Sequence, residues 1–333
     1  MATIKDVAAS AGVSVATVSH VINESRFVSE ETKVRVVTAI AELGYRRDGI
    51  ARSLRRNRTG TIGAVVSDIT NPFFSDLVKG IENTIHALPD RLNVILCNSE
   101  EDEARERELL DILMEKRVDG LIIAPAGGNL AYFEALGAEG PPLVFVDRVL
   151  PKVAADTVTI SNLSASEEAV RHLIERGYER IAVVRASLQA SSIEERVEGY
   201  RRALAKAGRQ IQPEWVLESA SNIDAAHDAG RKLLSLSPRP DAVFTTNNFM
   251  TLGLVRALNE AGLSTPDDIA VVGFDDFQWA EAFRPRISAI AQSGYAQGVE
   301  AARLLSARIS KTESGPPVHR LIETKLIVRE SSG

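Results

Sequence analysis

The sequence has little of what disulfide scaffolds, metal centres and membrane spans are built from. Among its 333 residues there is one cysteine, and the five histidines lie scattered without the spacing of metal ligands. The single cysteine, Cys97, can form no intrachain disulfide, and the apolar run around it favours a buried strand position. No run of about 18 apolar residues occurs, so we expect no membrane span.

Three motifs of common enzyme classes are also missing. There is no G-x-x-x-x-G-K-[ST] loop for phosphates, no G-x-G-x-x-G for dinucleotides and no G-x-S-x-G nucleophile elbow. Asp275 and Asp276 are adjacent carboxylates, but neighbouring residues at a strand end point in different directions. The N-terminus lacks the basic-then-apolar pattern of a signal peptide. We therefore expect a cytoplasmic protein that is not an enzyme and that needs no cofactor and no metal.

The charges are distributed unevenly along the chain. Residues 1–58 contain ten Lys and Arg against six Asp and Glu, a balance of +4, whereas the remainder contains 29 against 39, a balance of -10. A small basic segment on an acidic body is suited to binding a polyanion such as DNA, because the body is repelled and only the basic segment approaches. The composition, with 44% hydrophobic and 25% charged residues, is otherwise ordinary for a globular protein of two or three domains.

The first 45 residues have the pattern of a helix-turn-helix with a supporting third helix. Thr3 and Asp6 form a capping-box pair at the start of a first helix, and Gly12 ends that helix. Ser14 caps a second helix, and Ser29 caps a third. The inward face of the second helix carries Val18, Val21 and Ile22. Its other face carries small and polar groups that fit a major groove: Val15, Ala16, Thr17, Ser19, His20 and Asn23.

From Thr61 onward, apolar runs alternate with amphipathic helical stretches. The runs, for example 62–66, 120–124 and 181–184, are apolar throughout, as strands covered on both faces require. This alternation favours doubly wound parallel α/β sheets.

Four runs of residues, namely 3–23, 27–29, 43–45 and 51–54, closely resemble the lac repressor family of bacterial transcription regulators. Within that family the headpiece is most similar to that of the purine repressor, which shares the runs 19–23 and 26–28. The resemblance covers the whole chain, because the remainder has the length and motif order of the family's effector-binding core.

The resemblance implies an N-terminal all-α helix-turn-helix headpiece and an α/β core of two doubly wound parallel-sheet subdomains, like a periplasmic binding protein. The headpiece would span residues 1–45, a hinge helix and linker 46–60, and the effector-binding and dimerisation core 61–333. One subdomain would comprise about 61–161 and 291–320, and the other about 162–290 and 321–333. The chain would cross between them near Ser161, Ile290 and Leu321.

Ligands bind at the carboxyl ends of the strands in open α/β sheets, so polar residues just after the strands are pocket candidates. Carboxylates, amides and guanidinium groups next to aromatic rings suit a polyhydroxylated ligand. Arg196 and Asp275 also match family positions that hold effector, and Asn247 matches one in sugar-responsive members. The predicted effector-binding residues are Asp68, Phe74, Arg148, Arg196, Asn247 and Asp275.

The sequence leaves the identity of the effector open. Purine repressors place an arginine and a stacking phenylalanine where this chain has Ala190 and Ser221, which disfavours a purine. A sugar, sugar acid or sugar phosphate fits better, and Arg148 with Arg196 favours an acidic one. The alternatives are a repressor that senses a nucleobase or nucleoside, and a sugar-binding protein of a transport system. A transport protein would need a signal peptide and would have no headpiece, the reverse of what this sequence predicts.

The expected DNA partner is a palindromic double-stranded operator bound by a homodimer. No leucine-heptad helix follows the strand-like run 321–330, which favours a dimer over a tetramer. By resemblance, Leu54 would wedge between base steps of the minor groove, with Arg55 along the groove. The other predicted base contacts are Val15, Ala16, His20 and Arg26. The predicted phosphate contacts are Ser14, Thr17, Ser19 and Tyr45.

Overall fold

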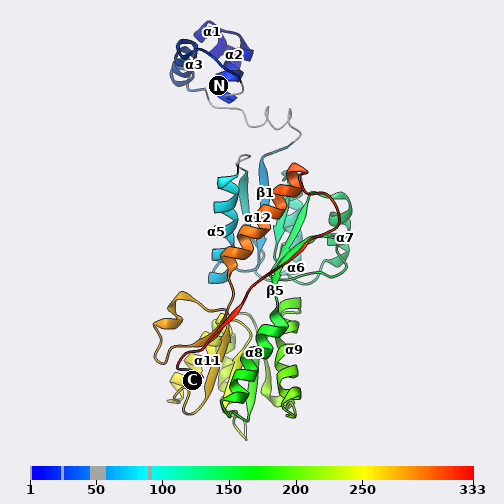
Figure 1. The fold of residues 1–333 in the computed structure, drawn as a ribbon, viewed down its shortest axis with the longest axis vertical. Helices are drawn as coiled ribbons and strands as arrows, with labels where there is room; N and C mark the ends of the chain where they lie inside the picture. The colour runs from blue at the N-terminus through cyan, green and yellow to red at the C-terminus, as the bar shows by residue number, and fades with distance from the viewer. Residues whose placement is uncertain (1, 24–25, 46–57, 89–91) are drawn as a thin grey trace. The chain divides into compact units, whose positions relative to one another are not determined.

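The computed structural model describes residues 2–23, 26–45, 58–88 and 92–333. The chain divides into two compact units, Met1–Thr59 and Gly60–Gly333 (Figure 1). The first unit is the headpiece and the second is the core. The predicted hinge residues Leu54 and Arg55 lie outside the described part of the chain.

The headpiece contains three helices, α1 (Ile4–Ala11), α2 (Val15–Asn23) and α3 (Glu30–Glu42). The capping box between Thr3 and Asp6 is present in both directions, and Gly12 ends α1 with a φ of 66°. That left-handed conformation is easily adopted only by glycine, so the turn between α1 and α2 depends on it. The helices pack on a small apolar core of Val7, Ala8, Ala11, Val18, Val36 and Ala39.

One predicted cap of the headpiece is wrong in its detail. Ser29 stands at the N-cap position of α3, but its side chain accepts no backbone hydrogen bond from the helix. Its hydroxyl instead donates to the Thr32 hydroxyl at 2.9 Å. Glu30 and Glu31 in the first turn still oppose the positive end of the helix dipole.

The first subdomain of the core is a six-stranded parallel sheet between two layers of helices. Helices α5 (Pro72–Ala87) and α12 (Gly294–Ser310) cover one face, and α6 (Glu103–Glu115) and α7 (Leu130–Glu139) cover the other (Figure 1). In sheet order the strands are β11 (His319–Ile322), β5 (Asp156–Ile160), β4 (Leu143–Val146), β3 (Leu121–Ile123), β1 (Thr61–Val66) and β2 (Asn93–Asn98).

The second subdomain repeats this architecture. Helices α8 (Asn162–Glu175) and α9 (Ser191–Lys206) cover one face of its sheet, and α10 (Ile223–Leu234) and α11 (Asn248–Glu260) cover the other. The 3-10 turns are η1 (Pro213–Trp215) and η2 (Gln278–Glu281). In sheet order the strands are β12 (Lys325–Ile327), β10 (Ser288–Ala291), β9 (Ala270–Phe274), β8 (Ala242–Thr245), β6 (Ile181–Ala186) and β7 (Val216–Ser219).

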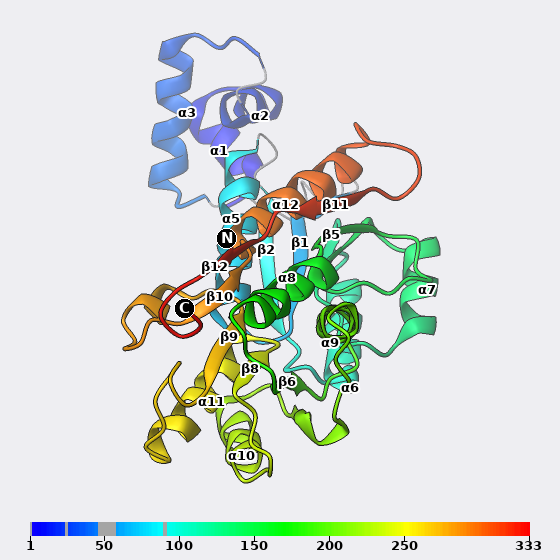
Figure 2. The ribbon, with the colours of Figure 1, turned by 60° about the horizontal axis from the view of Figure 1, so that its bottom comes forward.

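Strands β12, β10, β9, β8 and β6 lie side by side in Figure 2. Among the described strands of this sheet, only the edge strand β12 runs antiparallel to its neighbour, β10. The two doubly wound parallel sheets confirm the predicted fold class. The last two crossings between the subdomains were expected near Ile290 and Leu321. The chain leaves the second sheet after Ala291, at the end of β10, and leaves the first sheet after Ile322, at the end of β11.

The first turns of helix α12 contain Gly294 and Gly298, which weaken a helical pattern in the sequence. The structure explains them by the close packing of α12 on α5. A Cβ on Gly298 would lie 2.0 Å from the Leu77 carbonyl oxygen, and one on Gly80 would lie 2.2 Å from that of Tyr295. The glycines let the two helix backbones touch, and this fixes the N-terminal end of α12 next to the crossing segment.

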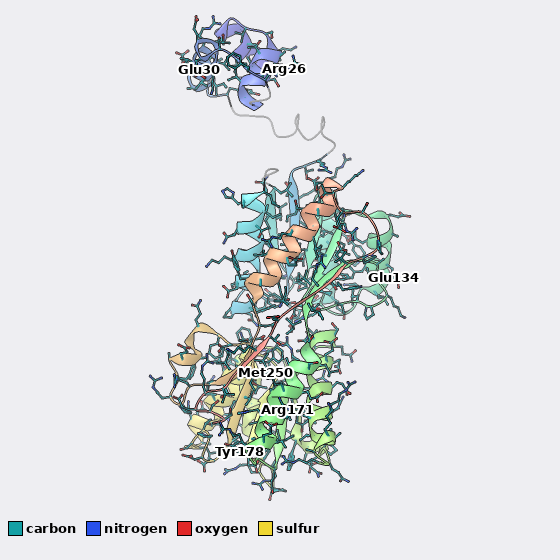
Figure 3. All side chains as sticks on the ribbon, in the orientation of Figure 1. Arg26, Glu30, Glu134, Arg171, Tyr178 and Met250 are labelled. Carbon is teal, nitrogen blue, oxygen red and sulfur yellow. The ribbon has the colours of Figure 1, made fainter. Side chains whose placement is uncertain are left out.

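Each subdomain has one apolar cluster on either face of its sheet. Met250, in the first turn of α11, is fully buried in the cluster beneath α10 and α11 (Figure 3). Within the described residues, no helix combines the length and the apolar character needed to cross a membrane. The same residues contain no group of three or more His, Cys, Asp or Glu side chains arranged to hold a metal ion.

Candidate functional site

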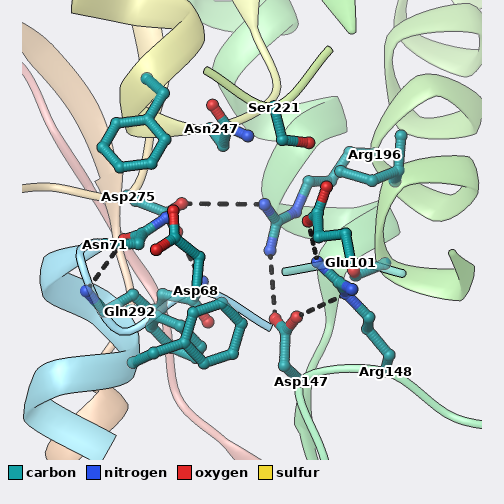
Figure 4. A pocket seen from close by; sticks show the side chains of 15 residues that line it. Asp68, Asn71, Glu101, Asp147, Arg148, Arg196, Ser221, Asn247, Asp275 and Gln292 are labelled. Atoms are coloured by element: carbon teal, nitrogen blue, oxygen red, sulfur yellow. Dashed lines mark hydrogen bonds and ion pairs between the residues drawn. The ribbon is translucent and has the colours of Figure 1, made fainter. Parts of the chain in front are cut away.

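A pocket between the two subdomains brings together all six residues predicted to bind effector (Figure 4). It encloses about 460 Å³ of empty space, including its open mouth. The six residues come from segments far apart in the sequence, at the carboxyl ends of strands and the first turns of helices. They are Asp68, Phe74, Arg148, Arg196, Asn247 and Asp275.

Arg196 is the most firmly held of these side chains. It projects from α9, is only 3% exposed, and lies with its guanidinium 3.7 Å from the centre of the Phe274 ring. Its Nε donates to Asn162 Oδ1 at 2.9 Å, and its Nη1 donates to the Thr246 carbonyl at 2.7 Å. A guanidinium that is stacked on a ring and held by two hydrogen bonds loses little conformational entropy when it binds a ligand. This favours a binding role for Arg196 over a surface ion pair.

Two buried aspartates flank Arg196, one from each subdomain. Asp147 Oδ1 lies 3.7 Å from Arg196 Nη2, and Asp275 Oδ2 lies 3.9 Å from Nη1. Both aspartates have positive φ, 62° and 68°, directly after strands β4 and β9. A non-glycine residue in this conformation is strained, and such strain is concentrated at functional sites.

Arg148 is likewise neutralised by carboxylates. Its Nη2 donates to Glu101 Oε1 at 2.7 Å, and its Nε lies 3.2 Å from Asp147 Oδ2. Figure 4 shows the resulting chain of ion pairs from Glu101 through Arg148, Asp147 and Arg196 to Asp275.

Asp275 has an unusual protonation equilibrium. Burial raises the pKa of its carboxyl above the ordinary value, while the charge of Arg196 and a hydrogen bond from Gln292 oppose that rise. Gln292 Nε2 donates to Asp275 Oδ1 at 2.5 Å.

The lining of the pocket holds four carboxyl groups, those of Asp68, Glu101, Asp147 and Asp275, and two guanidinium groups, those of Arg148 and Arg196.

The remaining predicted residues give the pocket its shape. Asn247 Oδ1 accepts from Met250 N at 2.8 Å and so caps α11. Because the oxygen is used by the cap, the Nδ2 amino group is the part of this side chain that can donate to a ligand. Phe74 packs edge-to-face on Phe73 with ring centres 5.0 Å apart. Asp68 accepts from the backbone and hydroxyl of Thr70 at 2.8 and 2.7 Å.

Sequence reasoning missed several lining residues. Of the other polar residues at strand ends, Asn98 has a structural role, because its Oδ1 accepts from Ile69 N. Asp276 pairs with Arg329 and does not line this pocket. The missed lining residues are Asn71, Glu101, Ser192, Ile193, Phe249 and Gln292. Only Asn71, as the residue before a helix-starting proline, had a recognisable signal.

On the headpiece, the predicted base-contacting residues Val15 and Ala16 are exposed, the former by 40%, and Arg26 is exposed as well. His20 and Ser19 are partly buried. The Ser14 hydroxyl accepts from Thr17 N at 3.1 Å and so caps α2, as predicted. Tyr45 is partly buried against the headpiece core.

Both parts of the chain match known protein families. Residues 3–48 match the family described as bacterial regulatory proteins, lacI family. Residues 59–330 match the periplasmic binding proteins and sugar binding domain of the LacI family.

Individual relatives cover nearly the whole chain. The HTH-type transcriptional repressor PurR of Vibrio campbellii (strain ATCC BAA-1116) is 37% identical over 332 residues, 99% of this chain and 98% of that protein. The ribose operon repressor of Escherichia coli (strain K12) is 39% identical over 312 residues, 93% of this chain and 94% of that protein.

Two solved structures have the same fold over nearly the same length. The complex of the transcriptional regulator CelR with cellobiose has a TM-score of 0.75 at 33% identity, covering 99% of this chain and 100% of that one. The lac repressor dimer bound to operator and the anti-inducer ONPF has a TM-score of 0.87 at 26% identity, covering 99% of each chain. These relatives are regulators of transcription rather than enzymes.

Proposed function

The chain belongs to the lac repressor family of DNA-binding transcriptional repressors, and from that premise we propose that a neutral sugar in the pocket controls its binding to an operator. The observation that carries the proposal is the pairing of both pocket arginines with carboxylates. Arg148 is paired with Glu101 and Asp147, and Arg196 lies between Asp147 and Asp275.

A sugar acid or sugar phosphate would bring further negative charge to a lining that already has four carboxyl groups and two arginines. Like charges in a buried site disfavour each other strongly. The expectation that Arg148 and Arg196 favour an acidic effector therefore gives way to a neutral ligand. Carboxylates can accept hydrogen bonds from vicinal hydroxyls, and the rings of Phe73, Phe74 and Phe249 offer apolar faces for a sugar ring.

Two relatives support the sugar assignment. The ribose operon repressor is named for a sugar operon, and the structure of CelR holds cellobiose. Relatives named PurR favour the alternative, a repressor that senses a nucleobase or nucleoside. Against it, Ser221 lines the pocket without supplying a ring, and Ala190 is buried in a small apolar cluster.

For the DNA side we propose a homodimer on a palindromic operator. Val15, Ala16, His20 and Arg26 would contact base edges, with Ser14, Thr17, Ser19 and Tyr45 on phosphates. Leu54 and Arg55, outside the described residues, would enter the minor groove. Effector binding would change the relation between the core subdomains and thereby the operator affinity. A transport protein would share the core but would have no use for the segment 3–48, which matches the lacI family of regulatory proteins.

The test is a titration of operator binding against a panel of ligands. A duplex selected from a random library serves as operator, and D-ribose, cellobiose, D-gluconate, ribose 5-phosphate and hypoxanthine are the probes. We expect a neutral sugar to shift operator affinity by at least ten-fold while the anionic probes do not. A response to hypoxanthine alone would replace the sugar by a nucleobase.

A further inference from the structure

Two asparagine side chains join the subdomains beside the pocket. Asn71 Nδ2 donates to Asn248 Oδ1 at 3.2 Å, and Asn248 Nδ2 donates back to Asn71 Oδ1 at 2.9 Å. The two residues are 8% and 2% exposed. Asn71 precedes α5 in the first subdomain, and Asn248 is the first residue of α11 in the second. A reciprocal amide pair of this kind forms only when both planes are aligned.

Each amide is held in place by its own subdomain. Asn71 Oδ1 also accepts from Phe73 N at 3.0 Å and so caps α5. Asn248 is the first residue of α11, and Asn247 before it caps that helix by accepting from Met250 N at 2.8 Å. Neither side chain can follow its partner if the subdomains separate, because hydrogen bonds weaken steeply beyond about 3.5 Å. The pair therefore senses the relative position of α5 and α11.

The pair also lies next to the ligand site. Asn71 lines the effector pocket, and Asn248 lines the neighbouring cavity. Phe73, Asp275 and Gln292 border both spaces, so the amide pair stands at the boundary between them. A ligand that binds Asp275 therefore contacts the wall that these two spaces share, beside the Asn248 amide.

We propose that Asn71 and Asn248 form a latch that holds the subdomains in the closed arrangement and couples that closure to the occupied pocket. The coupling of the latch to effector rests on the proposed function, whereas the closure of the subdomains by the latch does not. Other contacts also join the subdomains. Val149 N donates to Ser191 Oγ at 2.8 Å, Gln292 Nε2 donates to Asp275 Oδ1 at 2.5 Å, and Arg196 Nη2 lies 3.7 Å from Asp147 Oδ1. The latch is the side-chain pair that a substitution can remove on either side.

The variants Asn71→Ser and Asn248→Ala test the latch without removing the cap of α5. Serine caps helices about as well as asparagine but is too short to complete the amide pair. Asn222→Ser is the matched control, since Asn222 caps α10 at an exposed position by accepting from Ala225 N at 2.9 Å. All three are made in the full chain.

The first measurement needs no ligand. Fluorescent labels on Glu108→Cys in α6 and Lys232→Cys in α10, in a Cys97→Ser background, report the distance between subdomains by energy transfer. We expect each latch variant to lower the closed-to-open ratio by about ten-fold, the effect of losing two neutral hydrogen bonds against water. The double variant should shift no further than either single one, because either substitution removes the whole pair. The Asn222→Ser control should keep the distribution of the unsubstituted chain.

The second measurement uses D-ribose and cellobiose as probes. Whichever sugar binds the unsubstituted chain should dissociate about ten-fold faster from each latch variant, because an open pocket releases its ligand. If neither sugar binds, the proposed effector class fails while the distance measurement still decides the latch. Unchanged distance distributions in both Asn71→Ser and Asn248→Ala would overturn the latch itself.

Discussion

Strands β4 and β9 occupy the same place in the two sheets, third from the β11 and β12 edges, and they end in the same way. Asp147 follows β4 and Asp275 follows β9, both buried, both with positive φ, and both facing Arg196. The two subdomains thus place matching carboxylates on one shared guanidinium. That arrangement makes the cation a junction whose surroundings depend on both subdomains at once.

The residues that follow these two aspartates, Arg148 and Asp276, have different roles in the two subdomains. Arg148 lines the pocket and pairs with Glu101. Asp276 points away from the effector pocket and forms a two-point ion pair with Arg329, at 2.8 and 2.9 Å, in the C-terminal segment. The same position in the same topology therefore serves the ligand in one subdomain and holds the returning chain in the other. Topology determines where a side chain lies, and the neighbouring segments determine its role.

Removing the shared cation should have the largest effect. Arg196→Ala leaves Asp147 and Asp275 facing each other without a counter-charge, and it breaks the bonds to Asn162 and Thr246. We expect effector response to weaken ten-fold to a hundred-fold, about 2–3 kcal/mol, while operator affinity without effector barely changes. Arg202→Ala, at an exposed pair with Glu198 on the same helix, is the control. A normal effector dose response of Arg196→Ala would refute the pocket assignment.

The contrast between Arg148 and Asp276 predicts two separable phenotypes. Asp276→Ala leaves the largely buried Arg329 without its main partner, so the chain should lose about 2 kcal/mol of stability with effector response intact. Glu101→Gln should do the reverse, weakening effector response several-fold with little change in Tm. Thermal unfolding and effector titration of both variants check this. Equal effects of the two substitutions on both measurements would remove the contrast.

The two aspartates that face Arg196 can be probed by pH through Asp275. Because burial raises its pKa, the folded chain keeps this proton to a higher pH than the unfolded chain does. The folded state then binds more protons, so this group's contribution to stability falls as the pH rises above its ordinary pKa of 3.8. Asp275→Asn removes that loss, so its Tm relative to the unsubstituted chain should rise as the pH increases from about 4. A difference in Tm that stays constant with pH would show that burial does not raise the pKa of Asp275.

The smallest expected effect concerns the exposed ion pair between Arg286 and Glu330 in the C-terminal segment. Arg286 lowers the pKa of Glu330 to about 2 through direct hydrogen bonds. The depressed pKa contributes stability above the ordinary value of 4.5, and this contribution is lost as the pH falls from there toward 2. Glu330→Gln should therefore lower Tm by about 1 °C at pH 7 and by less at pH 3, since exposed pairs contribute little. An equal difference at both pH values would show that the ion pair is not responsible.

Local signals in the sequence were enough for much of the fold. The Thr3–Asp6 capping box and the Gly12 turn depend on residues within a few positions of each other, and the structure contains both. Short or polar elements were harder. Strand β11, at an edge, has an exposed sequence that lacks the apolar pattern of the central strands, and α12 contains the glycines that its packing on α5 requires.

The sequence by itself determined the class of fold and the headpiece, and together with the family resemblance it named six residues that meet in the pocket. The end of a parallel strand is a local feature that chain order reveals, whereas Arg196 lies on α9 and was supported by the family resemblance. Only the tertiary structure decided that Arg148 and Arg196 are already neutralised, because Glu101 and Asp275 approach them from distant parts of the chain. The Asn71–Asn248 pair, 177 residues apart, was equally hidden. Contacts between the subdomains leave no periodic pattern in the sequence. The charge balance of the pocket lining and the contact between Asn71 and Asn248 therefore became visible only in the structure.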